Sequence, residues 1–385
     1  MPAPTVGTNP NELSQWYTGA EPEDTKEIPG LKRLRSRCAA ENIIAIPDAV
    51  HRINGVALVR LEQTERIPDR KKLPSHAAVP CEKGDRMNRL REWLTDGRLL
   101  ITDGAWGTQL QARGLPSGIM PDTWNLTHPE HVEAVARAYA EAGSQVVLTN
   151  TFRANAVAMN CRFEADLDAI NCAGVALSRR GAGTALVFAS MGPTGKILLS
   201  GEISSEQASA AFAAQARSLA DAGADALLVE TMSDIAEARL AVAAARSTGL
   251  PVIVSFAFDS GKNKDRTMMG VTPEAAAAAM VEAGADAVGA NCGVGVERAL
   301  PICLRLRAAC DLPIWIKPNA GLPTIEGAAL HYSTSAEFFA SHYTAFREAG
   351  ASFLGGCCGS TPDFIRALVS ARHAASSSGK AQAAL

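Results

Sequence analysis

The sequence lacks the features that bring a chain into a membrane or onto a polyanion. It has no run of about 18 apolar residues, so we expect no membrane-spanning helix. Its 37 basic and 40 acidic residues nearly cancel, and the net charge of −3 gives no attraction to nucleic acid or to an anionic lipid surface. We therefore expect neither nucleic acid nor membrane among its partners.

The cysteine pattern excludes a second class, the small secreted domains held together by disulfides. Nine cysteines are an odd number, their spacing is not that of a disulfide framework, and no signal peptide opens the chain. Disulfides persist mainly in oxidising compartments. We expect free thiols and a cytoplasmic location.

A Gly-x-Gly-x-x-Gly motif is also absent after the first predicted strand, which argues against an open, doubly wound sheet. From residue 99 onward the sequence instead repeats a short apolar strand, a polar turn and an Ala-rich amphipathic helix, several of which end in Ala-Gly. Eight such units in about 280 residues predict an α/β fold of the closed (β/α)₈ TIM barrel type. The predicted strands are 99–102, 145–149, 185–190, 226–229, 251–257, 287–290, 313–317 and 352–355.

The composition divides the chain into three regions. Residues 1–86 mix Pro, Gly and charge with only brief apolar stretches, so we expect a poorly ordered N-terminal extension. Residues 87–370 hold the barrel, and residues 371–385 form a small tail rich in Ala and Ser. Met87 would be a natural first residue of the folded part, and the sequence leaves open whether the upstream segment belongs to the mature protein.

Three cysteines at the ends of predicted strands point to a metal. Cys292 ends the sixth strand in Gly-Ala-Asn-Cys-Gly, and the adjacent Cys357 and Cys358 end the eighth in Gly-Gly-Cys-Cys-Gly. In such barrels the functional groups lie at the carboxyl ends of the strands, so these sulfurs can meet there. Three protein ligands leave one coordination position open, which is typical of catalytic zinc. We predict a Zn²⁺ site formed by these three cysteines.

Six motifs, in order along the chain, resemble the homocysteine-binding domain of the homocysteine S-methyltransferases. This family includes the N-terminal module of cobalamin-dependent methionine synthase, betaine–homocysteine methyltransferase and enzymes that use S-methylmethionine. The resemblance runs from Leu90 to Leu368 and implies a zinc-dependent methyl transfer to homocysteine that forms methionine. The motifs are Asp103-Gly-Ala-x-Gly-Thr, Asn150-Thr-Phe, Glu230-Thr, Gly289-x-Asn-Cys-Gly, Lys317-Pro-Asn-Ala-Gly and Gly355-Gly-Cys-Cys-Gly.

Zinc would make the homocysteine thiol a nucleophile. A free thiol has a pKa near 8.5 and is mostly protonated at neutral pH, whereas coordination holds it as the thiolate. Three cysteine thiolates already overcompensate the charge of the ion, which leaves the incoming sulfur electron-rich for in-line attack on a methyl group. The metal would act as a template and a nucleophile generator, without redox chemistry.

The resemblance also implies which residues bind the substrate. Relatives carry carboxylates at the positions of Asp103 and Glu230 to hold the amino group of homocysteine, a role that suits a carboxylate at a strand end. Thr231 and Asn291 lie in the same motifs and are predicted to bind the substrate too. Two alternatives stay open: Asp103 could cap the helix that follows it, and the amides of Asn291 and Asn319 could cap loops.

The methyl donor is the least determined part. The predicted donor-site residues are Trp124, Phe152, Arg153 and Asn319. Trp124 stands where a betaine-dependent relative has a tryptophan, and an aromatic face suits a quaternary ammonium. Arg153, however, would repel a cationic donor, whether betaine or S-methylmethionine. The sequences around Trp124 and Thr267 are closer to the methionine synthase module, so we favour a stand-alone module of that type.

No Asp-x-His-x-x-Gly sequence that could ligate cobalt is present, so methylcobalamin would have to be carried by a separate protein. Two other hypotheses remain. The chain could be a homocysteine-binding subunit that works only when a corrinoid protein docks. The acceptor could also be another small thiol or selenol, such as selenohomocysteine or methanethiol.

Overall fold

The computed structural model describes residues 43–53, 56–66, 88, 90, 92, 97–159, 166–326 and 329–382. The chain divides into two compact units, Met1–Lys72 and Leu73–Leu385. In the first unit, β1 (Ile43–Ile53) and β2 (Val56–Arg66) form an antiparallel hairpin, which the sequence analysis did not anticipate. Most of the predicted extension, residues 1–86, lies outside the described residues, and its poor order remains a prediction.

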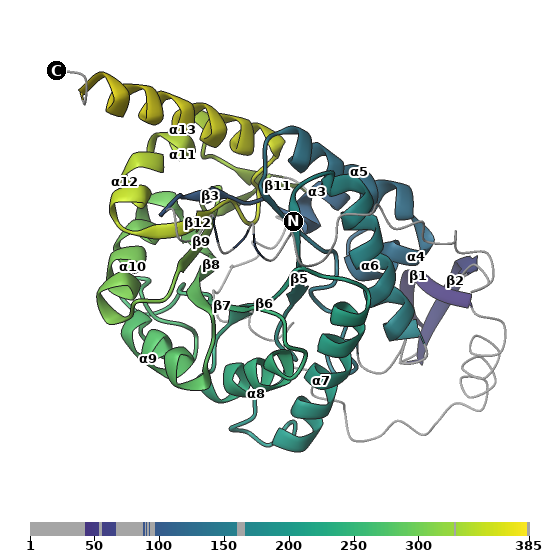
Figure 1. Cartoon of the computed structure of the whole chain (residues 1–385). Helices are drawn as coiled ribbons and strands as arrows, with labels where there is room; N and C mark the ends of the chain where they lie inside the picture. Colours follow the sequence, from purple (N-terminus) through teal and green to yellow (C-terminus); the bar gives the residue numbers. More distant parts are fainter. Residues whose placement is uncertain are drawn as a thin grey trace, which may run out of the picture. The chain divides into compact units, whose positions relative to one another are not determined.

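The second unit is a (β/α)₈ barrel in which helices surround a ring of strands (Figure 1). Its strands are all parallel, and they hydrogen-bond in the order β3-β12-β9-β8-β7-β6-β5-β4. A parallel bridge between Thr102 and Val146 joins the two ends and closes the ring. The strands are β3 (Leu100–Ile101), β4 (Val146–Leu148), β5 (Leu186–Met191), β6 (Ala226–Met232), β7 (Val252–Phe256), β8 (Ala287–Gly295), β9 (Ile314–Asn319) and β12 (Ala351–Leu354).

The barrel prediction is therefore confirmed, with all eight strands at their predicted places. The largest difference is at β8, which continues to Gly295, beyond the predicted end at residue 290. The helices before β4, β6, β8 and β12 end at glycines with positive φ, as their Ala-Gly endings predict: Gly143, Gly223, Gly284 and Gly350.

The connections follow barrel order. Between β3 and β4 lie α3 (Gly107–Gln111), η3 (Pro121–Thr123), α4 (Trp124–Thr127) and α5 (Pro129–Glu141). Single helices then connect successive strands as far as β9: α6 (Leu167–Ala182), α7 (Ser205–Asp221), α8 (Ile235–Arg246), α9 (Pro273–Ala283) and α10 (Val296–Ala309). The chain ends with α11 (Ala336–Ser341), α12 (Tyr343–Glu348), β12 and α13 (Pro362–Gln382). None of the helices in the described part combines the length and apolar character that crossing a membrane requires.

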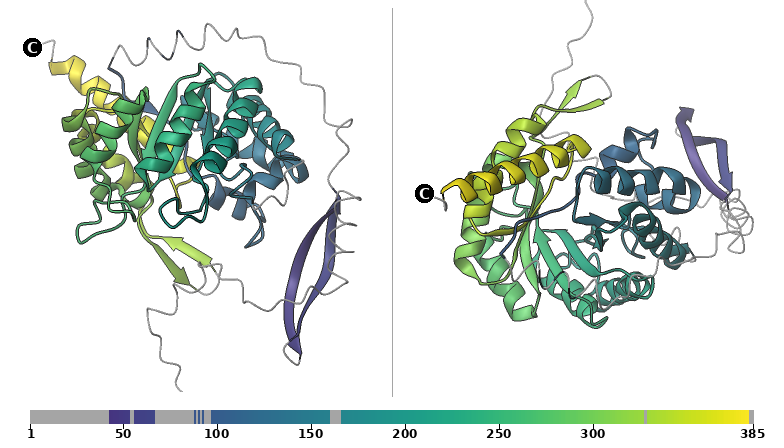
Figure 2. Two further views of the ribbon diagram at one scale, coloured as in Figure 1. Left: turned by 90° about the horizontal axis from the view of Figure 1, so that it is seen from below. Right: turned by 45° about the horizontal axis from the view of Figure 1, so that its top comes forward.

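An additional hairpin follows β9. It consists of β10 (Pro323–Glu326) and β11 (Ala329–Tyr332), which pair in antiparallel register, and it projects from the body of the barrel (Figure 2). These two strands were not predicted from the sequence.

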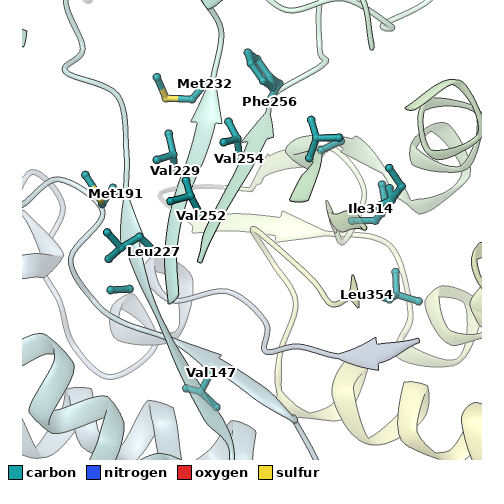
Figure 3. Close-up of a cluster of buried hydrophobic side chains, with 14 of the residues drawn as sticks. Val147, Met191, Leu227, Val229, Met232, Val252, Val254, Phe256, Ile314 and Leu354 are labelled. Carbon is teal, nitrogen blue, oxygen red and sulfur yellow. The ribbon is translucent and has the colours of Figure 1, made fainter. Parts of the chain in front are cut away.

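Side chains alternate between the two faces of the barrel sheet, as the period of two along a strand requires. One face packs against the helices; Val147, Leu227 and Val254 belong to this cluster (Figure 3). The other face fills the interior. Phe188 of β5 and Trp315 of β9 have ring centroids 6.0 Å apart although their strands are not neighbours, so they meet across the interior. The barrel is thus a packed core.

A polar layer lies above this apolar interior. Two residues beyond the interior positions Phe188, Leu228, Ile253 and Trp315, toward the carboxyl ends of the strands, the side chains are polar and buried. Because the side-chain period is two, they face the same interior. These residues are Ser190, Glu230, Ser255 and Lys317.

The interior leaves no room at Gly289 of β8. A Cβ atom there would overlap the carbonyl oxygen of Trp315 on the neighbouring strand. We predict that Gly289→Ala lowers the free energy of unfolding by about 3 kcal/mol or more, at the upper end for an overpacked core. Urea unfolding measures this. Gly107→Ala is the control, because nothing lies within 4 Å of its added Cβ, and equal stabilities of the two variants would contradict the packing described.

Candidate active site

The three predicted zinc ligands come together at the carboxyl end of the barrel. The Sγ atoms of Cys292, Cys357 and Cys358 all lie within 4.8 Å of one another, and those of Cys292 and Cys358 are 3.8 Å apart. Tetrahedral zinc with Zn–S bonds of about 2.3 Å requires sulfurs about 3.8 Å apart. The described part of the chain contains no other cluster of His, Cys, Asp or Glu that could hold a metal ion. The cluster therefore fits a tetrahedral ion with one position left for a further ligand.

The backbone presents these sulfurs in an unusual conformation. Cys292 has φ of +59°, which is rare for a residue with a side chain, and the β8–β9 register shifts directly after it. The Cys357 N–H donates to the carbonyl of Pro318 at 2.8 Å, and the carbonyl of Cys358 accepts from Ala320 N–H at 2.9 Å. Cys292 pairs with the same Pro318 in the β8–β9 ladder. Both cysteine loops are therefore connected to β9, which lies between β8 and β12.

Three thiols this close oppose one another's ionisation. Contact with Cys292 contributes most to raising the pKa of Cys357 well above its usual range, and burial adds to it. At Cys292, contact with Cys357 lowers the pKa, but contact with Cys358 and burial outweigh it and raise the pKa to about 12. A bound cation would reverse this balance, because coordinated thiols are deprotonated. The cluster therefore has the donor set of a metal site.

Glu230, on β6, lies in the polar layer next to this cluster. Its carboxylate accepts a hydrogen bond from Ser190 Oγ and a long one, 3.4 Å, from the Asn291 amide. Burial raises the pKa of Glu230, while the charge of Lys317 and the Ser190 hydrogen bond lower it. The charge of Glu230 also acts on Cys357, so the carboxylate and the sulfurs belong to one site.

Asn291 fixes the end of β6. Its Oδ1 accepts from the Thr231 N–H at 2.8 Å, and its Nδ2 donates to Thr231 Oγ1 at 2.7 Å. These bonds hold Thr231 at φ of +62° directly after Glu230. The structure therefore brings together three of the four predicted substrate residues, Glu230, Thr231 and Asn291, and places Asn291 directly before Cys292.

Asp103, the fourth, belongs to the same layer but is already paired. Its Oδ1 forms an ion pair with Lys317 Nζ, and its Oδ2 accepts from Trp106 Nε1 and from the Leu148 N–H, both at 2.8 Å. Helix α3 has no side-chain cap, so Asp103 does not cap it. Sequence reasoning missed the role of Lys317, although a lysine in an interior position of an apolar strand was the available signal.

The predicted donor-site residues do not all lie together. Trp124 is in α4, and Phe152 and Arg153 follow β4, whereas Asn319 ends β9. Trp124 is buried in α4 and stacks on the His128 ring at 4.3 Å. Phe152 lies against Gly192, and the backbone N–H of the exposed Arg153 donates to Asp122 at 2.8 Å.

Asn319 adjoins the cysteines. Its Nδ2 donates to the Gly293 carbonyl at 3.1 Å, and its buried Oδ1 has no partner within the described residues. Tyr332 of β11 is a neighbour that sequence reasoning missed: a Cβ on Gly359 would overlap its ring. Burial first, and then the charges of the three cysteines, raise the pKa of Tyr332 to about 12. The second hairpin therefore reaches the cysteine site.

A closed (β/α)₈ barrel with three converging cysteine sulfurs beside a buried carboxylate defines an α/β-barrel protein with a cysteine cluster that could hold a metal ion. The family model for homocysteine S-methyltransferase matches residues 100–372. The chain belongs to the homocysteine S-methyltransferase family.

Individual relatives agree with this assignment. The chain is 32% identical over 297 residues to the methionine synthases of Mycobacterium leprae and Mycobacterium tuberculosis, a match that covers 71% of this chain and 24% of each relative. It thus spans about a quarter of the length of these relatives. The homocysteine methyltransferase MmuM from Escherichia coli, in its metallated form, matches with a TM-score of 0.61 and 27% identity, over 72% of this chain and 98% of MmuM.

The buried carboxyl group of Asp122 makes the stability of the folded protein depend on pH. It is fully enclosed, and burial raises its pKa from 3.8 to about 6 despite the hydrogen bond from the Arg153 N–H. Between these two values the folded protein holds more protons than the unfolded chain, so stability falls as the pH rises through this window, by up to about 3 kcal/mol.

We predict that Asp122→Asn removes this fall. The difference in free energy of unfolding between variant and wild type, measured from pH 4 to pH 6.5, should shift in favour of the variant by about 2–3 kcal/mol as the pH rises. Parallel profiles for the two proteins would contradict the raised pKa.

Proposed function

We propose that the chain catalyses zinc-dependent methyl transfer to the thiol of homocysteine, forming methionine. The observation that supports this most is the convergence of three cysteine sulfurs, at the spacing of a zinc tetrahedron, in a member of this family. Cys292, Cys357 and Cys358 would hold the ion, and its fourth position would take the substrate sulfur. Bound zinc would keep that sulfur as the thiolate, the nucleophilic form.

The polar layer orients the rest of the substrate. Glu230 offers a buried carboxylate for the ammonium of the amino acid, and Ser190 and Asn291 hold that carboxylate in place. Thr231, fixed by Asn291, lines the same strand end. With the ammonium held in the layer and the sulfur at the cysteines, the thiol is directed toward the carboxyl face of the barrel, where a donor can approach.

The site requires reduced thiols. The cysteines in the described part of the chain are all free, and the three at the site must stay so to bind a metal. This supports the cytoplasmic location that the cysteine pattern predicts.

For the donor, we propose methylcobalamin carried by a separate corrinoid protein, so that the chain serves as a methionine-synthase-type homocysteine module. The identity with methionine synthases, of which it matches about a quarter, supports this. The exposed guanidinium of Arg153, next to the donor-site residue Phe152, disfavours a cationic donor. Betaine or S-methylmethionine remains the alternative, as does a homocysteine-binding subunit that is active only with a corrinoid partner.

Methionine formation tests the proposal. Purified zinc-loaded protein is given homocysteine and, separately, methylcobalamin with and without a corrinoid protein, betaine or S-methylmethionine. We expect methionine from one donor. Cys357→Ser should lose at least about 100-fold in rate, since even residues behind the metal ligands cost roughly 10- to 100-fold.

Cys310→Ser is the matched control, because Cys310 follows the last residue of α10, at the opposite end of that helix from the loop that carries Cys292. This variant should keep the rate and the zinc. Unchanged activity of Cys357→Ser would contradict the zinc mechanism. No methionine from any donor, with zinc bound, would contradict the proposed reaction with these donors and direct the search to a different corrinoid partner or to another thiol or selenol.

A further inference from the structure

Residues Cys357–Ser360 form the turn that carries two of the three proposed metal ligands, and we call it the ligand turn. Cys358 and Gly359 are its central residues, and the Ser360 N–H closes it by donating to the Cys357 carbonyl at 3.0 Å. Ser360 Oγ donates to the same carbonyl at 2.7 Å. Gly359 has φ of +82°, the value for the third residue of a type II turn. Having no side chain, Gly359 leaves the ligand turn open to packing by a neighbour.

The ring of Tyr332 packs on this glycine. The three atoms nearest to a Cβ added at Gly359 all belong to that ring, and the Cβ would overlap them. The tyrosine is half-buried and packs against the hydrophobic core. Burial is the largest cause of its raised pKa, and the charges of the three cysteines are the others, so its side chain lies beside the sulfurs. The ring thus fills the space that a side chain at position 359 would take.

The tyrosine and the ligand turn are held on one backbone segment. Tyr332 ends β11, where it pairs with Pro323 of β10. Two residues later, the Thr334 N–H donates to the Ala320 carbonyl at 3.3 Å, and the N–H of Ala320 donates to the Cys358 carbonyl at 2.9 Å. Ala320 directly follows β9, so the hairpin and the ligand turn are joined at the end of one strand. The hairpin therefore presents the ring at a fixed place on the ligand turn.

We propose that Tyr332 is a positioning residue for the metal site: its ring packs on Gly359 and holds the ligand turn in the conformation that binds the ion. This assignment rests on the proposed function and extends it, because it gives the β10–β11 hairpin a role. The contact is made by ring atoms, so the role belongs to the ring and not to the hydroxyl. Groups that orient metal ligands from behind change metal affinity by about 10- to 100-fold.

Zinc affinity measures this role without any methyl donor or acceptor. The full chain competes for zinc with a chromophoric chelator of known affinity. We expect Tyr332→Ala to bind zinc about 10- to 100-fold more weakly than the wild type, and Tyr332→Phe, which keeps the ring, to match the wild type. Phe338→Ala is the matched control, because it removes an exposed aromatic ring on α11 that contacts His342, and it should keep the affinity.

Cobalt distinguishes positioning from a general loss of stability. A thiolate site for Zn²⁺ also binds Co²⁺, whose visible absorption depends on the arrangement of the ligands. We expect the bands of cobalt-loaded Tyr332→Ala to differ from those of the wild type and of Tyr332→Phe. A purely structural role would lower the free energy of unfolding and leave the bands unchanged, which would contradict the proposal.

Wild-type zinc affinity in Tyr332→Ala, or an equal loss in Tyr332→Phe, would also overturn the assignment to the ring. If the alanine variant does not fold, a crystal structure of the zinc-loaded wild type decides. The Tyr332 ring in contact with Gly359 supports the proposal, and a ring turned away from Gly359 contradicts it. Failure of the wild type itself to bind zinc would instead contradict the proposed function.

Discussion

Compensation of buried charge is the constraint on which the carboxyl end of this barrel depends. Beneath the carboxyl end of the barrel, Phe188, Trp315 and their neighbours fill the interior and exclude water. Any charge placed directly above that interior is costly unless a partner of opposite charge lies beside it. Lys317 meets this need for Asp103. The charge of Lys317 also acts on Glu230. In the proposed function, an ammonium on Glu230 and a metal ion on the three thiols would complete the compensation of charge.

The strand geometry explains why these groups are neighbours. Along β5, β6, β7 and β9, every second side chain faces the interior of the barrel. On each of these strands the interior side chain changes from apolar to polar at the same height in the barrel. β9 lies between β8 and β12. It hydrogen-bonds the Cys357–Cys358 loop through Pro318 and the residue after Cys292 through Asn319, so the sulfurs are fixed relative to Lys317 on the same strand. The carboxylate that would hold an amino group and the sulfurs that would hold a metal are therefore set at a fixed separation by the barrel, which is what an acceptor carrying both an amine and a thiol requires.

The sequence predicted the barrel and the cysteine cluster because both depend on local patterns: apolar strands at regular spacing, and glycine-flanked cysteines at two strand ends. It did not predict the pairing of Asp103 with Lys317, since 214 residues separate them and only the closed ring makes them neighbours. The hairpin of β10 and β11 was missed because a strand of four residues is too short for its periodicity to distinguish it from a loop. The donor could not be predicted from the motifs because its identity depends on a second molecule.

The most direct test of the account is the coordination of the metal at the three cysteines. X-ray absorption at the zinc edge of the zinc-loaded protein should show three sulfurs at about 2.3 Å and one lighter ligand, and four sulfurs after homocysteine is added. That change would establish both the protein ligands and the position at which the substrate binds. Fewer than three sulfurs, or a coordination shell that homocysteine leaves unchanged, would contradict it.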